Sequence, residues 1–261
     1  MAAHRSSPSR RSGGGKVYLV GAGPGPAELL TLKAAELLRD ADVVVYDRLI
    51  QKSVLALASP GAERIHVGKP VGCHKSRQDE VNEVLVRKAR EGKRVVRLKG
   101  GDPFVLGRGG EEAAYLAESG VPFEVIPGVS SAIAAPLRAG IPVTHRDVAS
   151  CVVIATGHEA HRDEDRLDWA ALSKLDTLVF LMGVRNLGRI ASRLIEHGRD
   201  PATPAALIQM AYWPDERVLV ATLANIAEEA ERAQLQPPAT LVIGEVVRWR
   251  ERLRIKEKSQ G

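Results

Sequence analysis

The sequence predicts an α/β protein made of two α/β units, and three observations support this class. Short apolar runs of strand length alternate with amphipathic stretches of helix length along most of the 261 residues. Many of these runs end in glycine or in an acidic turn, as buried strands of α/β proteins do. Apolar residues make up 44% of the chain, which is enough to fill two compact cores.

The first half reads as strands and helices in strict alternation, which predicts a mainly parallel sheet. The first strand runs into the glycine- and proline-rich turn 21–26, and the second ends at a carboxylate, Asp47. The expected strands are 17–20, 42–47, 64–67, 94–98 and 123–126, and the expected helices are 27–39, 78–91 and 111–119.

The second half begins near residue 129 and contains neighbouring strands with hairpin-like spacing, so a mixed sheet is expected there. Its expected helices are 129–139, 186–197 and 223–233, and its expected strands are 152–155, 177–182, 205–209, 217–221 and 240–247. The resulting division is a disordered tail at 1–15, an N-terminal domain at 16–128, a C-terminal domain at 129–250 and a basic tail at 251–261.

The net charge of +5 lies at the two ends of the chain. Residues 1–15 carry +3 and residues 248–261 carry +4, so the remainder carries −2. With only 4% aromatic residues, this distribution argues against a nucleic-acid partner. There is no apolar run of the ~18 residues that a membrane span needs, and the N-terminus lacks the apolar core of a secretory signal. The isolated Cys73 and Cys151 suit a reducing cytoplasm.

Residues 97–112, RLKGGDPFVLGRGGEE, form the most informative segment, with five glycines and one proline between a predicted strand and a predicted helix. Such turns let a ligand approach the backbone closely. Asp102 and Arg108 place polar groups inside this glycine-rich frame, which a simple tight loop would not require.

The turn GAGPGP at 21–26 is close to a dinucleotide-binding fingerprint, and Asp47 follows at the distance of a ribose-binding acid. The third glycine is replaced by Pro26, however, and Pro24 and Pro26 have no N–H group to donate to a pyrophosphate. A ligand without phosphates suits this turn better. A nicotinamide-dependent oxidoreductase is therefore the weaker interpretation.

Seven motifs in register resemble those of the tetrapyrrole methylases over about residues 16–248. They are the GAGPG turn, Tyr46-Asp47-Arg48-Leu49, the segment 97–112, VIPGVSSA at 125–132, GIPVTHR at 140–146, Thr156-Gly157-His158 and Met182-Gly183-Val184. The second and third motifs are most similar to the branch that acts on uroporphyrinogen III.

The resemblance implies two α/β domains with S-adenosylmethionine bound in the cleft between them. The implied reaction methylates uroporphyrinogen III at carbons 2 and 7 to give precorrin-2, on the way to siroheme and cobalamin. A homodimer is also implied. No oxidase–chelatase module of the fused siroheme enzymes is visible, so a monofunctional methylase is expected.

A sulfonium methyl group is already activated, so alignment of donor and acceptor is the main requirement. The attacked pyrrole gains positive charge, which Asp47 could stabilise or relieve by accepting the N–H proton. A turn-capping role is the alternative for Asp47. The substrate carries many carboxylates, and the cations in matching motifs are Arg48, Lys69, Arg108 and Arg146. We assign Lys69 and Arg108 to catalysis with Asp47, and Arg48 and Arg146 to substrate binding, although Arg146 fits a surface ion pair equally well.

By the same resemblance, Pro24 and the Gly100-Gly101-Asp102 segment hold the donor, and the backbone of Ala211 approaches its adenine. The side chains expected to line the donor pocket are Val105, Ser130, Ser131 and Met182. Met182 could instead fill a gap in the core.

Three further features bear on function. The spacing of His158 and His161 does not match a zinc motif, so no metal is expected. The stretch 210–217, MAYWPDER, departs from the uroporphyrinogen branch and is more like the precorrin-4 branch. A methylase of a later corrin precursor is therefore the alternative enzyme, and a binding protein without turnover is the alternative from another class.

Overall fold

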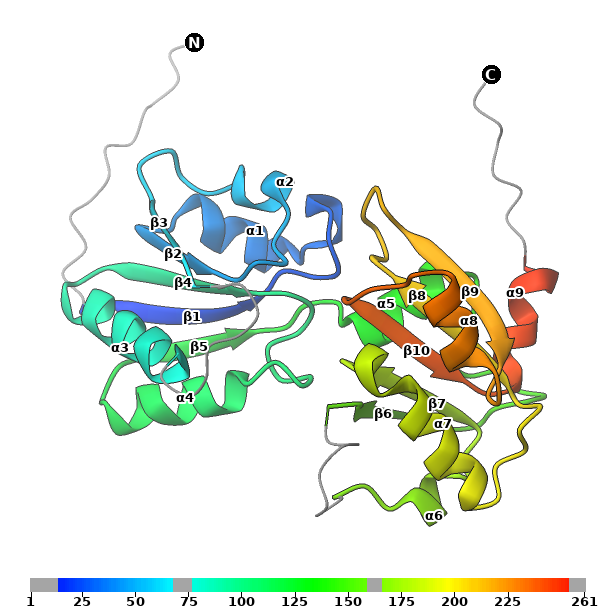
Figure 1. Ribbon diagram of the computed structural model, residues 1–261. Helices are drawn as coiled ribbons and strands as arrows, with labels where there is room; N and C mark the ends of the chain where they lie inside the picture. The colour runs from blue at the N-terminus through cyan, green and yellow to red at the C-terminus, as the bar shows by residue number, and fades with distance from the viewer. Residues whose placement is uncertain (1–13, 68–76, 159–165, 254–261) are drawn as a thin grey trace, which may run out of the picture.

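The computed structural model describes residues 14–67, 77–158 and 166–253, and it contains two sheets that lie side by side (Figure 1). The first half of the chain builds one sheet and the second half builds the other. The α/β class with two units is therefore confirmed. Within the described residues, no helix is both long and apolar enough to cross a membrane.

The first sheet is parallel throughout and has the order β3-β2-β4-β1-β5. Its strands are β1 Lys16–Gly21, β2 Val43–Tyr46, β3 Glu63–His66, β4 Arg94–Lys99 and β5 Phe123–Ile126. The helices between them are a 3₁₀ turn Ala27–Leu29, α1 Leu32–Arg39, α2 Lys52–Leu55, α3 Arg77–Arg90 and α4 Gly109–Glu118. Because all these strands are parallel, their carboxyl ends lie at one edge of the sheet.

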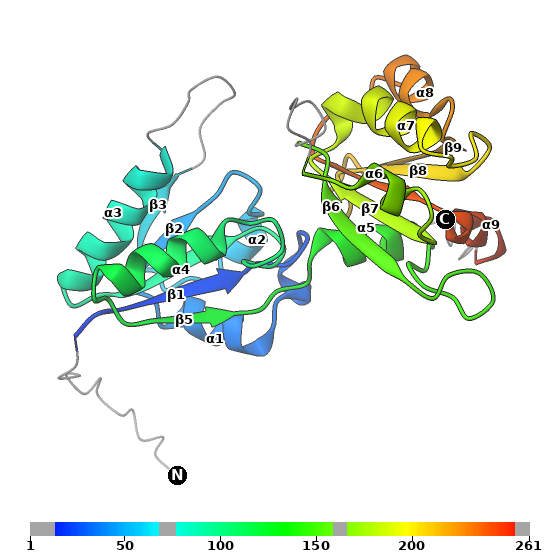
Figure 2. The same ribbon diagram turned by 90° about the horizontal axis from the view of Figure 1, so that it is seen from below.

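Helices cover both faces of this sheet, as an all-parallel sheet requires. Helices α1 and α2 pack on one face around Leu38 and Leu98, and α3 and α4 pack on the other around Leu85 and Leu116. Figure 2 shows α3 and α4 together on the near side of the strands, with α1 on the far side. The strands are apolar on both faces for this reason, which explains why the sequence shows runs rather than alternation.

The second sheet is mixed and has the order β6-β7-β10-β8-β9. Strands β6 and β7 are parallel, β10 is antiparallel to β7 and β8, and β8 and β9 form an antiparallel pair. The strands are β6 Val152–Thr156, β7 Thr177–Leu181, β8 Pro204–Gln209, β9 Arg217–Thr222 and β10 Ala239–Ile243. The helices are α5 Ser131–Arg138, α6 Trp169–Leu172, α7 Leu187–Glu196, α8 Ile226–Arg232 and α9 Trp249–Arg252, with 3₁₀ turns Val184–Asn186 and Glu245–Arg248.

Two apolar clusters hold this second unit together. One packs α6, α7 and α8 against a face of the sheet around Phe180 and Leu207, and the other packs α5 and the turn after β10 against the opposite face around Val179 and Val242. The expected mixed sheet is confirmed.

Several element boundaries differ from the expectation. The predicted helix 27–39 is divided, because Thr31 has an extended backbone and its hydroxyl caps α1 by accepting from the N–H of Ala34 at 3.2 Å. The predicted strand 240–247 ends at Ile243, because Gly244 has φ 145° and the chain turns there. The short helices α2, α6 and α9 were not expected, since four residues are too few to show a helical period.

Candidate active site

The carboxyl ends of strands from both sheets converge where the two units meet. Strand β10 begins beside the first unit (Figure 1), and its antiparallel partners β7 and β8 therefore end on that side. The first sheet presents the loops after β1, β2, β4 and β5 to the same junction. In open α/β sheets, ligands bind outside the carboxyl ends of the strands, so this junction is the candidate site.

Glycines allow three segments of backbone to touch at the centre of the junction. Gly23 and Gly101 form a bridge, with the Gly101 N–H donating to the Gly23 carbonyl at 2.8 Å. A Cβ on Gly128 would lie 2.3 Å from the Gly101 carbonyl oxygen, and a Cβ on Gly21 would lie 2.5 Å from the Gly128 nitrogen. These glycines are required by backbone packing, whereas an added Cβ on Gly100 would meet only the Leu49 Cβ among the described residues, at 3.9 Å. Gly100 therefore leaves open space beside the loop.

Asp102 ties this loop to the segment that connects the two units. One carboxylate oxygen accepts from the Phe104 N–H at 2.8 Å, and the other accepts from the Gly128 N–H at 3.0 Å. This carboxylate therefore shapes the loop, and its predicted contact with the donor stays a prediction.

Arg108 lies at the end of the same loop with φ 59°, just before α4 begins. Its guanidinium forms an ion pair with Glu111, with Nη2 to Oε2 at 2.5 Å, and this bond raises the pKa of Arg108 above its ordinary value. The Arg108 side chain is 56% exposed, so this ion pair lies at the surface. A carboxylate of a ligand could therefore replace Glu111 as the partner of Arg108.

Asp47 follows β2 at the strand-end edge and accepts a hydrogen bond from a buried arginine. Arg97 Nη2 donates to Asp47 Oδ1 at 2.8 Å, and the Arg97 side chain is only 4% exposed. The structure thus gives Asp47 a charged partner from β4 and leaves its side chain 35% exposed to the junction. A carboxylate held in this way can take part in chemistry at the strand ends.

Behind Asp47 lies a cluster of buried charges that the sequence interpretation missed. Glu112 Oε1 accepts from Arg97 Nε at 3.2 Å, from Lys99 Nζ at 2.8 Å and from Gln78 Nε2 at 3.0 Å. Burial, followed by the charge of Arg97, lowers the pKa of Lys99 below its ordinary value, while Glu112 opposes this. The available signal was the pair of cations, Arg97 and Lys99, two residues apart near the end of a strand, which places both on one face of β4.

A second contact joins the units on the other side of the junction. Gln51 Nε2, just before α2, donates to the Tyr212 carbonyl after β8 at 3.0 Å. Gly25 fits beneath this residue, since a Cβ there would lie 3.3 Å from the Tyr212 Cβ and 2.7 Å from Gln51 Nε2. The departure at 211–212 therefore forms part of the contact between the units.

Unusual backbone geometry also concentrates at this junction. Within the described residues, six non-glycine residues have positive φ, and five of them lie in the loops after β4, β7 and β8: Leu106, Arg108, Met182, Met210 and Tyr212. Such conformations cost of order 1–3 kcal/mol each and cluster at functional sites. Their grouping supports the location of the site independently of the motifs.

Large apolar side chains are exposed on the same loops. Met182 is 52% exposed, so the alternative that it fills the core is wrong, and Phe104 is 59% exposed. Leu49 and Leu106 are each 40% exposed. Exposed apolar groups beside cations suit a ligand with an apolar body and charged arms.

The other predicted donor residues lie on the loops around the junction. Ser130 caps α5 by accepting from the Ala132 N–H at 3.2 Å, and Ser131 begins that helix. An added Cβ on Gly101 would lie 3.6 Å from the Ser131 nitrogen, so the start of α5 adjoins the glycine loop. Pro24, Val105 and Ala211 are each partly exposed in the loops after β1, β4 and β8.

The structure does not bring every predicted residue to the junction. Arg146 lies in a turn closed by His145 and Ala149 before β6 begins, whereas Met182 lies at the opposite end of the neighbouring parallel strand β7. His145 stacks on Trp249, with 3.8 Å between ring centroids, which ties this turn to α9. Arg48 is exposed on the loop after β2.

Two predictions fall partly or wholly outside the described residues. Lys69 lies in the range 68–76 and His161 in the range 159–165, and the structure describes neither range. Among the residues that it does describe, no group of three or more His, Cys, Asp or Glu side chains could hold a metal.

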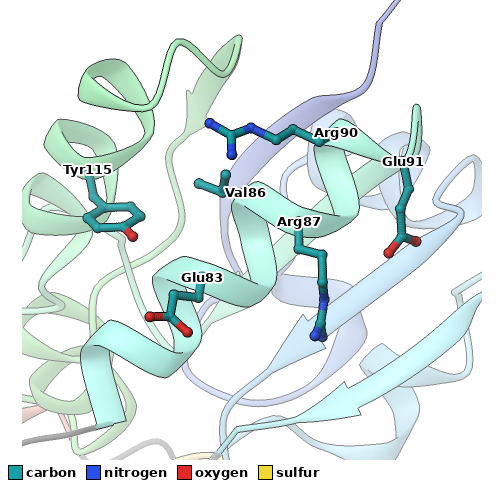
Figure 3. Close-up of a pocket in the computed structure, with 6 residues that line it drawn as sticks. All are labelled: Glu83, Val86, Arg87, Arg90, Glu91 and Tyr115. Atoms are coloured by element: carbon teal, nitrogen blue, oxygen red, sulfur yellow. The ribbon is translucent and has the colours of Figure 1, made fainter.

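A separate hollow of about 420 Å³ lies between α3 and α4 on the outside of the first unit (Figure 3). Its lining residues are Glu83, Val86, Arg87, Arg90, Glu91 and Tyr115. Arg90 donates to the Ser119 carbonyl at 3.2 Å, so one of the cations that line the hollow already has a backbone partner. The hollow contains none of the predicted site residues.

The fold and the site together define a class of α/β protein. It has two sheets whose strand ends meet around a glycine-rich loop, and the turn after its first strand is not suited to binding phosphate. Residues 16–227 match the family model "Tetrapyrrole (Corrin/Porphyrin) Methylases". The chain belongs to this family, and the resemblance drawn from the motifs is confirmed.

Individual relatives agree with the family. An "S-adenosyl-L-methionine-dependent uroporphyrinogen III methyltransferase" of Methanosarcina barkeri is 55% identical over 89% of this chain and 92% of its own length. A "siroheme synthase" of Azotobacter vinelandii is 52% identical over 92% of this chain, which spans about half of that longer protein.

Solved structures show the same relationship. A Thermus thermophilus uroporphyrin-III C-methyl transferase, determined with S-adenyl homocysteine, is 46% identical with a TM-score of 0.76, covering 90% of this chain and 99% of its own. A cobalt precorrin-4 methyltransferase has a TM-score of 0.78 but is only 29% identical, covering 89% and 95% of the two chains.

Proposed function

We propose that this protein uses S-adenosylmethionine to methylate uroporphyrinogen III at carbons 2 and 7, giving precorrin-2. The observation that carries the proposal is Asp47, a partly exposed carboxylate at the strand-end junction that a buried arginine holds in place. Relatives with this activity in their names are similar to the chain over nearly its whole length.

The residues at the junction fit a donor of this kind. Gly100 leaves open space beside the loop after β4. Met182 and Ala211 come after strands β7 and β8 of the second unit, on the other side of the junction. The turn after β1 contains Pro24 and Pro26 and so lacks the N–H groups that a pyrophosphate would need. When bound, S-adenosylmethionine supplies a methyl group that is already activated by the positive sulfur.

Asp47 is the proposed proton acceptor. A pyrrole carbon that forms a new bond to a methyl group leaves the ring positively charged, and loss of the N–H proton restores neutrality. Asp47 would stabilise that charge and accept the proton. Arg97, which donates to Asp47 Oδ1, fixes the orientation of the carboxylate and leaves Oδ2 available.

The substrate would be recognised by the charge of its carboxylate arms and by its apolar pyrrole rings. Arg48 and Arg108 are exposed cations on the loops after β2 and β4, and they can bind the acetate and propionate arms. Arg108 would exchange Glu111 for a substrate carboxylate. The exposed Leu49, Phe104 and Leu106 would contact the apolar face of the macrocycle.

The alternative of a later corrin precursor is not favoured, because the uroporphyrinogen enzymes are 46% and 55% identical and the precorrin-4 enzyme is 29% identical. The two alternatives are separated by one assay without oxygen. The protein is incubated with S-adenosylmethionine and freshly generated uroporphyrinogen III, and the methyl groups on the tetrapyrrole are counted by mass spectrometry. Two added methyl groups are expected. No added methyl group, with donor binding intact, would contradict the proposal.

Three further statements belong to this proposal. We place the boundary between the domains at residues 128–129, between β5 and α5, and we place the protein in the cytoplasm. We also propose a homodimer, because α5 exposes Ile133 and Leu137, four residues apart and so on one side of the helix, with exposed fractions of 39% and 66%. Light scattering on the purified protein gives the molecular mass that tests the dimer.

A further inference from the structure

The buried cluster behind Asp47 is built from charged groups on two elements of the first unit. Arg97 and Lys99 come from β4, and Glu112 comes from the first turn of α4. The exposed fractions of their side chains are 4%, 5% and 0%. Glu112 is the anion that both cations share, and among the described residues Arg97 is the only member of the three that forms a hydrogen bond with Asp47.

The bonding of Glu112 is asymmetric. Its Oε1 accepts from Arg97, Lys99 and Gln78, whereas its buried Oε2 accepts from no group in the part of the chain that the structure describes. A buried carboxylate oxygen without a partner weakens a fold. Buried ion pairs in general add little stability compared with apolar side chains of similar volume. Stability alone therefore does not explain this arrangement. The hydrogen bond from the cluster to Asp47 does explain it.

The geometry points to a specific role for the carboxylate. We propose that Glu112 is a positioning residue for Asp47, which it orients through the Arg97 guanidinium. Glu112 fixes the Nε side of that guanidinium and leaves Nη2 directed at Asp47 Oδ1. This inference rests on the proposed function, because it concerns how the proposed proton acceptor is held.

Charge balance gives the same conclusion. Within the described residues, the charged groups that act on Lys99 are Arg97, Glu112 and Asp47, together with its burial. Without the charge of Glu112, two buried cations would remain, and Asp47 would be their only counter-charge in this part of the structure. The Arg97 guanidinium would then be less well anchored. Asp47 would lose its fixed orientation, and the balance of charge around it would change.

A double-mutant cycle tests the proposal with Asp47→Asn, Glu112→Gln and both changes together. Glu112→Gln alone should lower kcat for methyl transfer about 10- to 100-fold, because misplacement of a reacting group is costly. Binding of S-adenosylhomocysteine should stay within about twofold. In the Asp47→Asn background, the same change should alter kcat by less than about twofold, since the group that it positions is already lost.

The control is Glu118→Gln, an exposed glutamate in the last turn of the same helix, which should leave kcat unchanged. A purely structural role for Glu112 would lower the melting temperature and affect both backgrounds equally, and equal factors would overturn the proposal. If Asp47→Asn retains full activity, the proposed function of Asp47 fails instead, which keeps the two failures distinct.

A crystal structure provides a readout that does not depend on turnover. In the Glu112→Gln protein, the distance from Arg97 Nη2 to Asp47 Oδ1, now 2.8 Å, should exceed hydrogen-bond range. If that variant does not fold, Glu112→Asp keeps the charge but shortens the side chain and enters the same cycle. An unchanged Arg97–Asp47 bond with normal kcat in either variant would overturn the inference.

Discussion

Among the residues that the structure describes, the first unit buries charged side chains, whereas the second unit buries only uncharged ones among its polar residues. The buried polar residues described in the first unit are Asn82, Arg97, Lys99 and Glu112, and those described in the second are Ser173, Thr177, Thr203 and Thr240. A buried charge is costly unless it is paired, and a buried hydroxyl is far less so. The costly buried charges lie in the first unit, where Arg97 connects them to Asp47. We therefore infer that the first unit carries the chemistry.

The second unit contributes shape to the same junction. Its loops place Met182 and Tyr212 in strained conformations with φ 57° and 67°, facing the first unit. Its partly buried Arg199 donates to the carbonyls of Ser173, Leu175 and Asp176 and therefore stabilises the fold. Variants of the two units should thus differ in kind, with loss of turnover in one and loss of stability in the other.

The largest expected effect is on turnover in the first unit. Asp47→Asn removes the proposed proton acceptor and should lower kcat by about 10²- to 10⁴-fold. Donor binding, measured by calorimetry with S-adenosylhomocysteine, should remain within a few-fold. Asp40→Asn is the control and should leave kcat unchanged, because the only side-chain partner of Asp40 among the described residues is Arg94, in a surface ion pair. Similar losses of kcat in both variants would show that Asp47 has no special role in turnover.

The second largest effect is on the stability of the second unit. Leu194 on α7 is fully buried, and Leu194→Ala should lower the free energy of unfolding by about 2–5 kcal/mol. Denaturant titration measures this, and kcat of the folded protein should stay within about twofold. Leu32→Ala, at a residue 86% exposed, should change stability by less than about 0.5 kcal/mol. A large fall in kcat with Leu194→Ala would show that the second core takes part in catalysis.

A smaller effect is expected where the two units touch. In Gly128→Ala, the new Cβ would lie 2.3 Å from the Gly101 carbonyl oxygen, so backbone must move at a cost of about 1–3 kcal/mol. Donor affinity should fall as well, because Gly101 belongs to the proposed donor loop. Gly110→Ala is the matched control, since no described residue lies within 4 Å of its added Cβ and alanine favours the helix. Equal donor affinity in both variants would place the donor elsewhere.

The smallest effect is the pH dependence of a single carboxylate in the second unit. The N–H groups of Ser150 and Cys151 donate to Asp176 at 2.7 and 3.2 Å, and they lower its pKa below the usual 3.8. A lowered folded pKa adds stability above the unfolded pKa, and this is lost as pH falls through the folded value. Asp176→Asn should therefore flatten the stability curve below about pH 4, and the exposed Asp215→Asn should not. Unfolding titrations between pH 2 and 6 measure the difference.

The sequence predicted the two units and the loops of the site, and the reason is local. Glycine turns, the acidic end of β2 and apolar runs are encoded within a few residues, so Asp47, Gly100 and Asp102 could be placed at strand ends. The Arg97–Glu112 pair could not, because it joins residues 15 positions apart whose meeting depends on how α4 packs on the sheet. The same holds for the contact of Gln51 with Tyr212, which spans 161 positions.

Arg146 shows the limit of motif matching in the same way. Its motif is in register with the family, yet its turn lies before β6, at the end of the strand away from Met182. Sequence register gives the order of the motifs along the chain, whereas the direction of each strand decides which edge of the sheet a motif reaches. A similar argument divides the expected helix 27–39 at Thr31, where a side-chain cap outweighs a continuous apolar pattern.

A crystal structure of the protein with S-adenosylhomocysteine tests the proposed site most directly. We expect the ligand at the junction, against Gly100 and Gly101 of the first unit and against Met182 and Ala211 of the second, with Asp47 beside the space next to its sulfur. A ligand bound away from these strand ends, for example in the hollow between α3 and α4, would contradict this expectation.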